Sequence, residues 1–376
     1  MTNRRPRGIP TGGQFAPGAR AEVDVDLGEE PVHTVRSDGA EEWRLNGQLH
    51  REDGPAVVWP DGTQEWYRNG KRHREDGPAI VDSDGAKSWM RGGLLDREDG
   101  PAVIRPDGTE MWYRRGGVHR GDGPAIVHPD GTEEWWLNDE RHRDDGPAVV
   151  RSDGTKEWYR NSERHRDGGP AVLHADGTEE WYQRGHRHRG DGPAIVRSDG
   201  GEMWYRDNRL HRNGGPAILD EDGSEEWYLN GERHRDDGPS VTDRNGYQEW
   251  HQHGQLHREG RPAVAWPSGR QEWHQHGQLH REDGPALVND NGSVEWYRNG
   301  RRHREDGPAI VYPDGYQSWY QDGRRHREDG PAIVSPNGVR EWYQNGELHR
   351  EDGPAITRPD GSEEWWRHDI RVDPPA

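Results

Sequence analysis

A tryptophan recurs every 23 residues along most of this 376-residue chain, and that period constrains the fold more than any other feature. Fifteen tryptophans, from Trp43 to Trp365, keep the register without an insertion or deletion. Counted from each tryptophan as position 1, the unit reads W-Y-x-N-G-x-x-H-R-E-D-G-P-A-I-V-x-x-D-G-T-x-E. Such a period is typical of repeat proteins, in which each unit packs on its neighbours and no large globular core is needed.

Two turn signals in each unit predict β-hairpins. Asn-Gly at positions 4–5, as in Asn69-Gly70, and Asp-Gly at positions 19–20, as in Asp61-Gly62, favour tight hairpin turns. One proline and several glycines per unit disfavour helices of any length. We therefore expect an all-β fold of tandem 23-residue antiparallel hairpins with three short strands a unit, near positions 14–18, 21–3 and 6–10. These would form an elongated, twisted meander sheet or a superhelical solenoid.

Counting across the turns predicts which residues face each other, if both turns hold two residues. Across the Asp-Gly turn, Val57 would face Trp66, Val58 would face Glu65 and Ala56 would face Tyr67. Across the Asn-Gly turn, Trp66 would face His73 and Glu65 would face Arg74, an opposite-charge pair that favours this register. The tryptophans would form a ladder with the aliphatic residues beside it as a thin core. The structural residues expected from this register are Trp66, Trp89, Trp112, His73, Arg74, Glu65, Pro78 and Gly62.

Composition alone is typical of a disordered chain, because only 27% of the residues are hydrophobic and the net charge is −20. The repeat limits that prediction to the first 28 residues, which lie outside the period and are rich in glycine, proline and arginine. We expect a flexible tail over 1–28 and a repeat array over 29–376. The array would begin with a degenerate half-unit at 29–43 and end with a cap at 365–376, as terminal repeats often do.

Several functions are disfavoured by the same composition. The acidic charge argues against binding nucleic acid, and no apolar run is long enough to insert into a membrane. The chain has no cysteine and no recognisable secretory signal, which favours a cytoplasmic location. No nucleophile elbow, phosphate loop, dinucleotide fingerprint or carboxylate pair stands out from the repeat background. We therefore expect no enzyme activity and no cofactor.

Binding residues are expected on the face opposite the tryptophans. The aromatic residues at position 2 form the candidate exposed row: Tyr67, Tyr113, Trp136, Tyr159, Tyr182 and Tyr205.

Three ligand alternatives concern histidine and aspartate. The histidines at position 8 are expected to pack beside the facing tryptophan and to bond locally, with a pH or metal role as the alternative. Two pairs at i, i+2 spacing are candidate metal ligands, although solvent-exposed substitution explains them as well. Calcium at the Asp-Gly turns would need more oxygens than one aspartate a turn supplies. The paired histidines are His251, His253, His274 and His276.

Two stretches, Glu65-Trp66-Tyr67-Arg68-Asn69-Gly70-Lys71 and Asp76-Gly77-Pro78-Ala79, resemble MORN-type repeats, above all the variant in bacterial YwqK-like antitoxin modules. The resemblance implies a β-repeat scaffold and suggests an antitoxin-like or phage- and defence-related role. From the uniform units we expect a scaffold that binds a protein partner along an extended face. The alternative is a cell-wall or glycan-binding protein that uses its aromatic rows.

Overall fold

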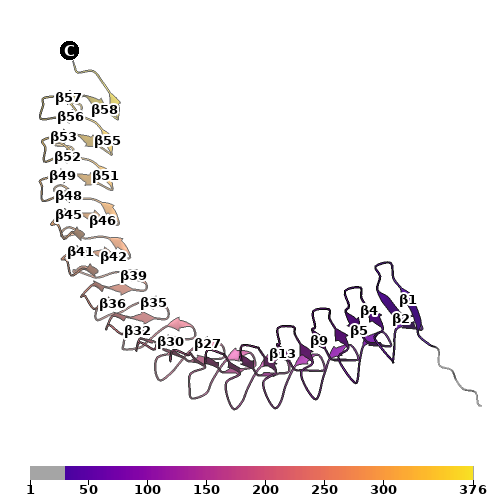
Figure 1. Ribbon diagram of the computed structural model, residues 1–376. Helices are drawn as coiled ribbons and strands as arrows, with labels where there is room; N and C mark the ends of the chain where they lie inside the picture. The colour runs from indigo at the N-terminus through magenta and orange to yellow at the C-terminus, as the bar shows by residue number, and fades with distance from the viewer. Residues whose placement is uncertain (1–29, 376) are drawn as a thin grey trace, which may run out of the picture. The chain divides into compact units, whose positions relative to one another are not determined.

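The computed structural model describes residues 30–375, and within that range the chain forms 59 short β-strands and no helix (Figure 1). The predicted all-β repeat fold is therefore confirmed. The repeats divide into two units, Met1–Pro106 and Asp107–Ala376, which are described separately. The tail predicted over residues 1–28 lies outside the described residues. The described range holds no helix with the length and apolar character needed to cross a bilayer.

The strands follow the 23-residue period. After β1 (Val32–Val35), β2 (Glu41–Leu45) and β3 (Gln48–Leu49), every strand has two residues. The first full repeat contains four strands: β4 (Val57–Val58), β5 (Gln64–Glu65), β6 (Tyr67–Arg68) and β7 (Lys71–Arg72). Each strand recurs every 23 residues, and its label rises by four each time, up to β56–β59. The bounds of these four strands therefore give the bounds of all later ones.

Each repeat contributes to two layers. Its first two strands join an antiparallel meander, which in the N-terminal unit follows the order β1, β2, β4, β5, β8 (Ile80–Val81), β9 (Lys87–Ser88) and β12 (Val103–Ile104). In the C-terminal unit the same antiparallel pairing pattern runs from β13 (Glu110–Met111) to β57 (Glu363–Glu364). The last two strands of each repeat form a separate two-stranded hairpin, such as β6–β7. The result is an open, solenoid-like repeat sheet.

The Asn-Gly turn has the predicted register. Tyr67 pairs with Arg72 and Arg68 pairs with Lys71, which leaves two residues in the turn. Asn69 and Gly70 both have positive φ, at 50° and 71°, as a type I′ turn requires. Asparagine and glycine tolerate this conformation better than other residues, so the register is encoded locally.

The Asp-Gly turn has three residues, so the predicted two-residue register is wrong by one. Trp59 N–H bonds to the Thr63 carbonyl at 2.9 Å, which places Pro60, Asp61 and Gly62 in the loop. Only Gly62 in this loop has positive φ, and the Asp61 carboxylate accepts the Thr63 N–H at 2.9 Å, so a type I turn closed by one glycine replaces type I′. The next repeat forms the same loop with Ser83 in place of Pro60.

The facing pairs shift as a consequence. Val57 faces Glu65, Val58 faces Gln64, and Ala56 bonds to the Glu65 carbonyl, whereas Trp66, Glu65 and Tyr67 were the predicted partners.

The predicted middle strand is interrupted at the tryptophan. Trp66 N–H donates to the Ala79 carbonyl of the next repeat at 2.8 Å, while its own carbonyl accepts the His73 N–H of the hairpin at 3.0 Å. The residue therefore belongs to the meander through one group and to the hairpin through the other. Trp66 is the corner at which the chain leaves the sheet, and this gives four strands a repeat where three were predicted.

Small aliphatic residues form the core. The alanine at position 14 is fully buried in every described repeat that has it, from Ala56 to Ala355, and the aliphatic residue after it is buried or half-buried. Among the periodic tryptophans only Trp273 is buried, and no two of them are in ring contact within residues 30–375. The predicted tryptophan ladder is thus a row of half-buried corners beside an alanine core.

The two ends of the array depart from the repeat. At the start, β1 pairs with β2 over four residue pairs, and the His33 ring stacks on Trp43 at 4.4 Å. At the other end, β58 (Trp366–Arg367) and β59 (Ile370–Arg371) still form a hairpin, with His368 and Asp369 in the turn. Both predicted terminal segments are therefore built as hairpins.

Candidate functional site

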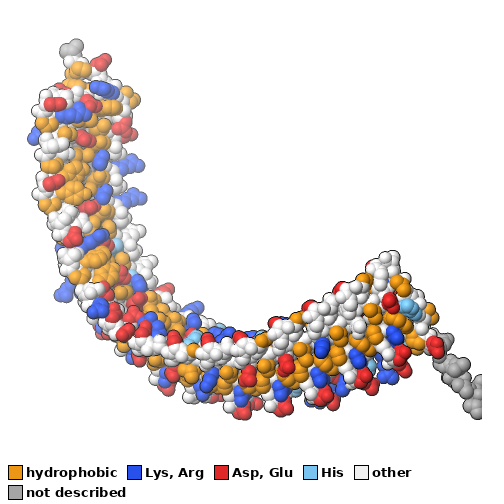
Figure 2. All heavy atoms as spheres, in the orientation of Figure 1, with side chains coloured by type: hydrophobic (Ala, Val, Ile, Leu, Met, Phe, Trp, Pro, Cys, Tyr) orange, Lys and Arg blue, Asp and Glu red, His pale blue; other side chains and the backbone are white. Residues whose placement is uncertain are grey.

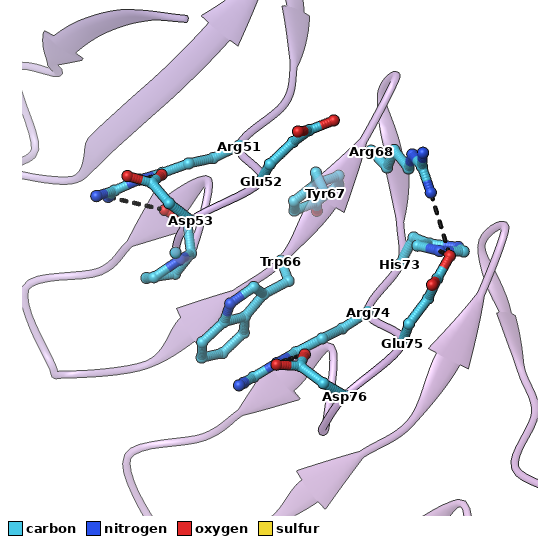
Figure 3. A pocket seen from close by; sticks show the side chains of 12 residues that line it. Arg51, Glu52, Asp53, Trp66, Tyr67, Arg68, His73, Arg74, Glu75 and Asp76 are labelled. Atoms are coloured by element: carbon cyan, nitrogen blue, oxygen red, sulfur yellow. Dashed lines mark hydrogen bonds and ion pairs between the residues drawn. The ribbon is translucent and has the colours of Figure 1, made fainter.

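A groove lies between the loops of consecutive repeats. In Figure 3 its walls are the loop that begins at Arg51 and the loop that begins at Arg74, and Trp66 and Tyr67 lie between them. Grooves lined by the same repeat positions occur again beside Trp43, Trp204 and Trp250. The groove is therefore a property of the repeat, and it is the candidate site.

An arginine clasp shapes each loop. The Arg74 guanidinium lies over the Trp66 ring at 4.2 Å, its Nε donates to Asp76 at 2.9 Å, and its Nη1 donates to the Pro78 carbonyl at 3.4 Å. A Cβ at Gly77 would lie 2.8 Å from the Arg74 Cζ, so a side chain there would displace the guanidinium. This explains why the repeat reads R-x-D-G-P.

The clasp recurs with little variation. In fourteen repeats the arginine eight residues after the tryptophan covers its ring at 3.7–4.3 Å, as Arg97 covers Trp89 and Arg120 covers Trp112. A guanidinium over an indole is a favourable cation–π contact. The ring face that meets the arginine is thus covered.

The predicted Glu65–Arg74 pair does not form, because Arg74 serves the clasp. Glu65 instead pairs with Arg72 at 3.0 Å and accepts the Tyr67 hydroxyl at 2.6 Å. Burial raises the pKa of Glu65, but the bonds from Arg72 and Tyr67 outweigh burial and hold that pKa below its ordinary value. The carboxylate is therefore a buried, ionised acceptor that joins the sheet to the hairpin.

The prediction that the position-2 aromatic residues are exposed is wrong. Tyr182 is 7% exposed, and the other five, namely Tyr67, Tyr113, Trp136, Tyr159 and Tyr205, are half-buried. Several of these side chains donate to the glutamate two residues before them, as Tyr182 does to Glu180 at 2.7 Å. Burial and this bond raise the pKa of Tyr182. The row is part of the packing between strands rather than a free surface.

The position-8 histidines connect neighbouring repeats, whereas the sequence predicted bonds within each repeat. His73 Nδ1 accepts the Gly92 N–H of the next hairpin at 3.1 Å, and the corresponding bond from Asn69 to His50 is 3.2 Å. In a neutral ring this assigns the hydrogen to Nε2. The Nε2 of His73 lies 3.4 Å from a carboxylate oxygen of Glu75 in its own loop.

The four candidate metal ligands do not converge. His251 is buried against Ser240 at 2.8 Å, whereas His253 stands in the turn with φ +48° and contacts the His234 ring. His274 bonds to Glu272 at 2.9 Å, and His276 takes the same turn position as His253. The i, i+2 spacing fails because the second residue of each pair belongs to the turn.

Exposed carboxylates form the rim of the grooves. Glu75 and Asp76 have side chains that are 74% and 83% exposed. The hydrogen bond and charge of Arg74 lower the pKa of Asp76, so this carboxyl is ionised at neutral pH. Figure 2 shows acidic and basic side chains in regular alternation beside a row of hydrophobic ones. Sequence reasoning missed this rim, although the recurrent E-D pair before Gly-Pro was its signal.

Comparisons with known proteins do not assign the chain to a family. No protein-family model matches the chain, so the resemblance to MORN-type repeats stays a prediction. No curated protein matches it either. Among solved structures it is similar to the TCP10 domain of Danio rerio CPAP in complex with a peptide of Danio rerio STIL. That similarity covers 82% of this chain and 95% of the other, with 15% identity and a TM-score of 0.15. A TM-score this low supports no conclusion about the chain.

Proposed function

We propose that this chain is a non-enzymatic repeat scaffold that binds a protein partner along the row of grooves. The recurrence of one groove at the same repeat positions carries the proposal. Similar sites at a fixed spacing suit an elongated ligand, because each further repeat adds a contact of the same kind.

The chemistry of the rim indicates a cationic partner. The loop carboxylates are ionised and exposed, and the chain carries a net charge of −20. Each repeat adds two strands to its sheet, so neighbouring loops lie about 9.6 Å apart if strands are about 4.8 Å apart. Three residues of a polyproline II helix make one turn and rise about 9.3 Å. A polypeptide in this conformation with a basic residue at every third position would therefore present one positive charge to each groove.

Two narrower roles follow from the sequence. The resemblance to antitoxin modules suggests that the partner is a toxin or another protein of phage and defence systems. The glycan alternative depends on exposed aromatic rings. Its support is weak, because the position-2 rings are half-buried and the tryptophans lie under arginines.

A charge-matched pair of variants tests the proposal. The first neutralises three loop carboxylates (E282Q, E305Q, E328Q), and the control neutralises three exposed hairpin carboxylates (E140Q, E163Q, E232Q). Binding of an eighteen-residue peptide with arginine at every third position is measured by calorimetry at two salt concentrations. We expect salt-dependent binding that the loop variant loses and the hairpin variant keeps. Equal losses in both variants, or equal binding of a scrambled peptide, would contradict it.

A further inference from the structure

One loop of the array has no carboxylate. Of the fourteen R-x-x-x-P loops, only the one that begins at Arg212 lacks an acid at both position 10 and position 11, where Asn213 and Gly214 stand. In most of the other loops these acids bind the clasp arginine, as Asp76 does, or face the histidine, as Glu75 does. The groove beside Trp204 therefore differs in charge from its neighbours.

Other repeats show what occupies this place. The Glu75 carboxylate bridges Arg68, at 3.2 Å, and His73 Nε2, at 3.4 Å, and in Figure 3 a dashed line joins Arg68 to this carboxylate beside the His73 ring. The same bridge forms at Asp167, which lies 3.0 Å from Arg160 and 3.1 Å from His165. A third copy connects Arg298, Glu305 and His303 at 3.2 and 3.5 Å. Arginine at position 3 and histidine at position 8 thus form a receptor for one carboxylate.

The receptor is present but unfilled in the loop of Arg212. His211 is 6% exposed, its Nδ1 accepts the Asn230 N–H at 3.1 Å, and its buried Nε2 has no hydrogen-bond partner. Within residues 30–375 no carboxylate lies within ion-pair distance of Arg206 or Arg212. A buried donor without a partner is costly, and the equivalent atom of His73 faces a carboxylate.

One groove brings these groups together. His211, Arg206 and Arg212 line it together, and its volume is about 340 Å³. Its only carboxylate is Asp191, which is already bound to Arg189 at 3.0 Å. We propose that this groove binds a carboxylate group from outside the chain, held by Arg206 and the Nε2 hydrogen of His211 as Glu75 is held in its own repeat.

The test uses acetate as the probe and the ring ¹⁵Nε2 resonance of His211 as the readout, assigned by its loss in H211Q. Spectra of the full chain are recorded at pH 7 and constant ionic strength, with chloride as the reference salt. We expect a saturable shift with half-saturation in the millimolar range. The shift should fall at least fivefold in N213E, which supplies the missing carboxylate, and should persist in N213Q. A shift that does not saturate, or that N213E leaves unchanged, would overturn the proposal.

Two further arms complete the test. Replacing Glu75 by asparagine and Asp76 by glycine should create a second acetate response, at His73, and no response there would count against the receptor geometry. A capped Gly-Asp-Gly peptide should produce the shift, and its Gly-Asn-Gly counterpart should not. That result would identify the ligand as a polypeptide side chain. Binding of acetate without binding of the peptide would identify it as a small carboxylate. Binding of phosphate in place of acetate refutes the choice of carboxylate. The result is independent of the cationic peptide experiment.

Discussion

Replacing Arg72 by leucine isolates the cost of leaving a buried carboxylate without its cation. Glu65 is 6% exposed and lies 3.0 Å from the Arg72 Nε, while the Arg72 side chain is 41% exposed. Two unit charges at that distance attract by about 5.5 kcal/mol at an effective dielectric of about 20. Solvent contact of the arginine reduces this, so we expect R72L to destabilise its repeat by about 2–3 kcal/mol.

The double variant E65M/R72L is the matched control. The chain already contains this combination, because Met203 and Leu210 occupy the same two positions in another repeat. Replacing both partners by apolar residues removes the uncompensated charge, so the double variant should lie within about 1 kcal/mol of the wild type. The coupling between the two sites should then reach at least about 1.5 kcal/mol.

The assay must report on one repeat, because an array does not unfold in a single step. Hydrogen exchange of the His73 amide is suitable, since that amide bonds to the Trp66 carbonyl at the base of the hairpin. A loss of about 2 kcal/mol corresponds to roughly 30-fold faster exchange. The cost of R72L should also shrink at acidic pH, where Glu65 is neutral. Equal exchange in R72L and the double variant, or a cost that does not depend on pH, would refute the reasoning.

Three further predictions concern other contacts. A263S should stabilise its repeat by about 0.5–1.5 kcal/mol, because a serine hydroxyl would satisfy the buried and unpartnered Nδ1 of His274; hydrogen exchange of the amides of that repeat measures the gain. R74A should destabilise by about 1–2 kcal/mol and speed exchange of neighbouring amides, because the Trp66 ring loses its guanidinium. Burial raises the pKa of Glu157, but hydrogen bonds from arginine and tyrosine outweigh burial and hold this pKa below 4.5. The ionised carboxylate therefore stabilises the fold fully above pH 4.5, and this stabilisation is lost as the pH falls through the lowered pKa of the folded state. The stability of E157Q should consequently depend less on pH.

Each of these predictions has a control in the chain. Ser240 already bonds to His251 at 2.8 Å, so S240A should cost what A263S gains, and a neutral result in both would contradict the assignment. R68A removes an exposed ion pair and should change stability by less than about 0.5 kcal/mol. If R68A destabilises as much as R74A, the contact of Arg74 with the Trp66 ring is not what stabilises the loop. An E157Q profile parallel to that of the wild type would contradict the pH prediction.

The sequence predicted the fold class and half of the register. The 23-residue period, the absence of helices and the Asn69-Gly70 turn all depend on local preferences, which neighbouring residues in the chain decide. The prediction for the loop at Asp61 failed because only Gly62 takes positive φ there, while Asp61 keeps negative φ and its carboxylate accepts the Thr63 N–H. One residue of register moves every side chain to the other face, so that single error also misplaced Val57.

The candidate site could be predicted only in its residue types. The conserved order R-x-D-G-P within the repeats marked a special loop, but its clasp joins the loop to a tryptophan that sequence counting placed opposite a histidine. The unfilled receptor at His211 could be recognised only from the sequence and the structure together. Its missing acids are visible in the sequence, whereas the buried Nε2 and the bridging carboxylates of other repeats are visible only in the structure.

The sequence by itself determined that this protein is an all-β repeat with a uniform period of 23 residues. The tertiary structure decided that Trp66 is a corner, that Arg74 covers it, and that Tyr67 and Glu65 are held between strands. The physical reason is that turns and strands follow from local backbone preferences. Burial and side-chain partners depend on how the next repeat docks, and a chain read in one dimension does not contain that contact.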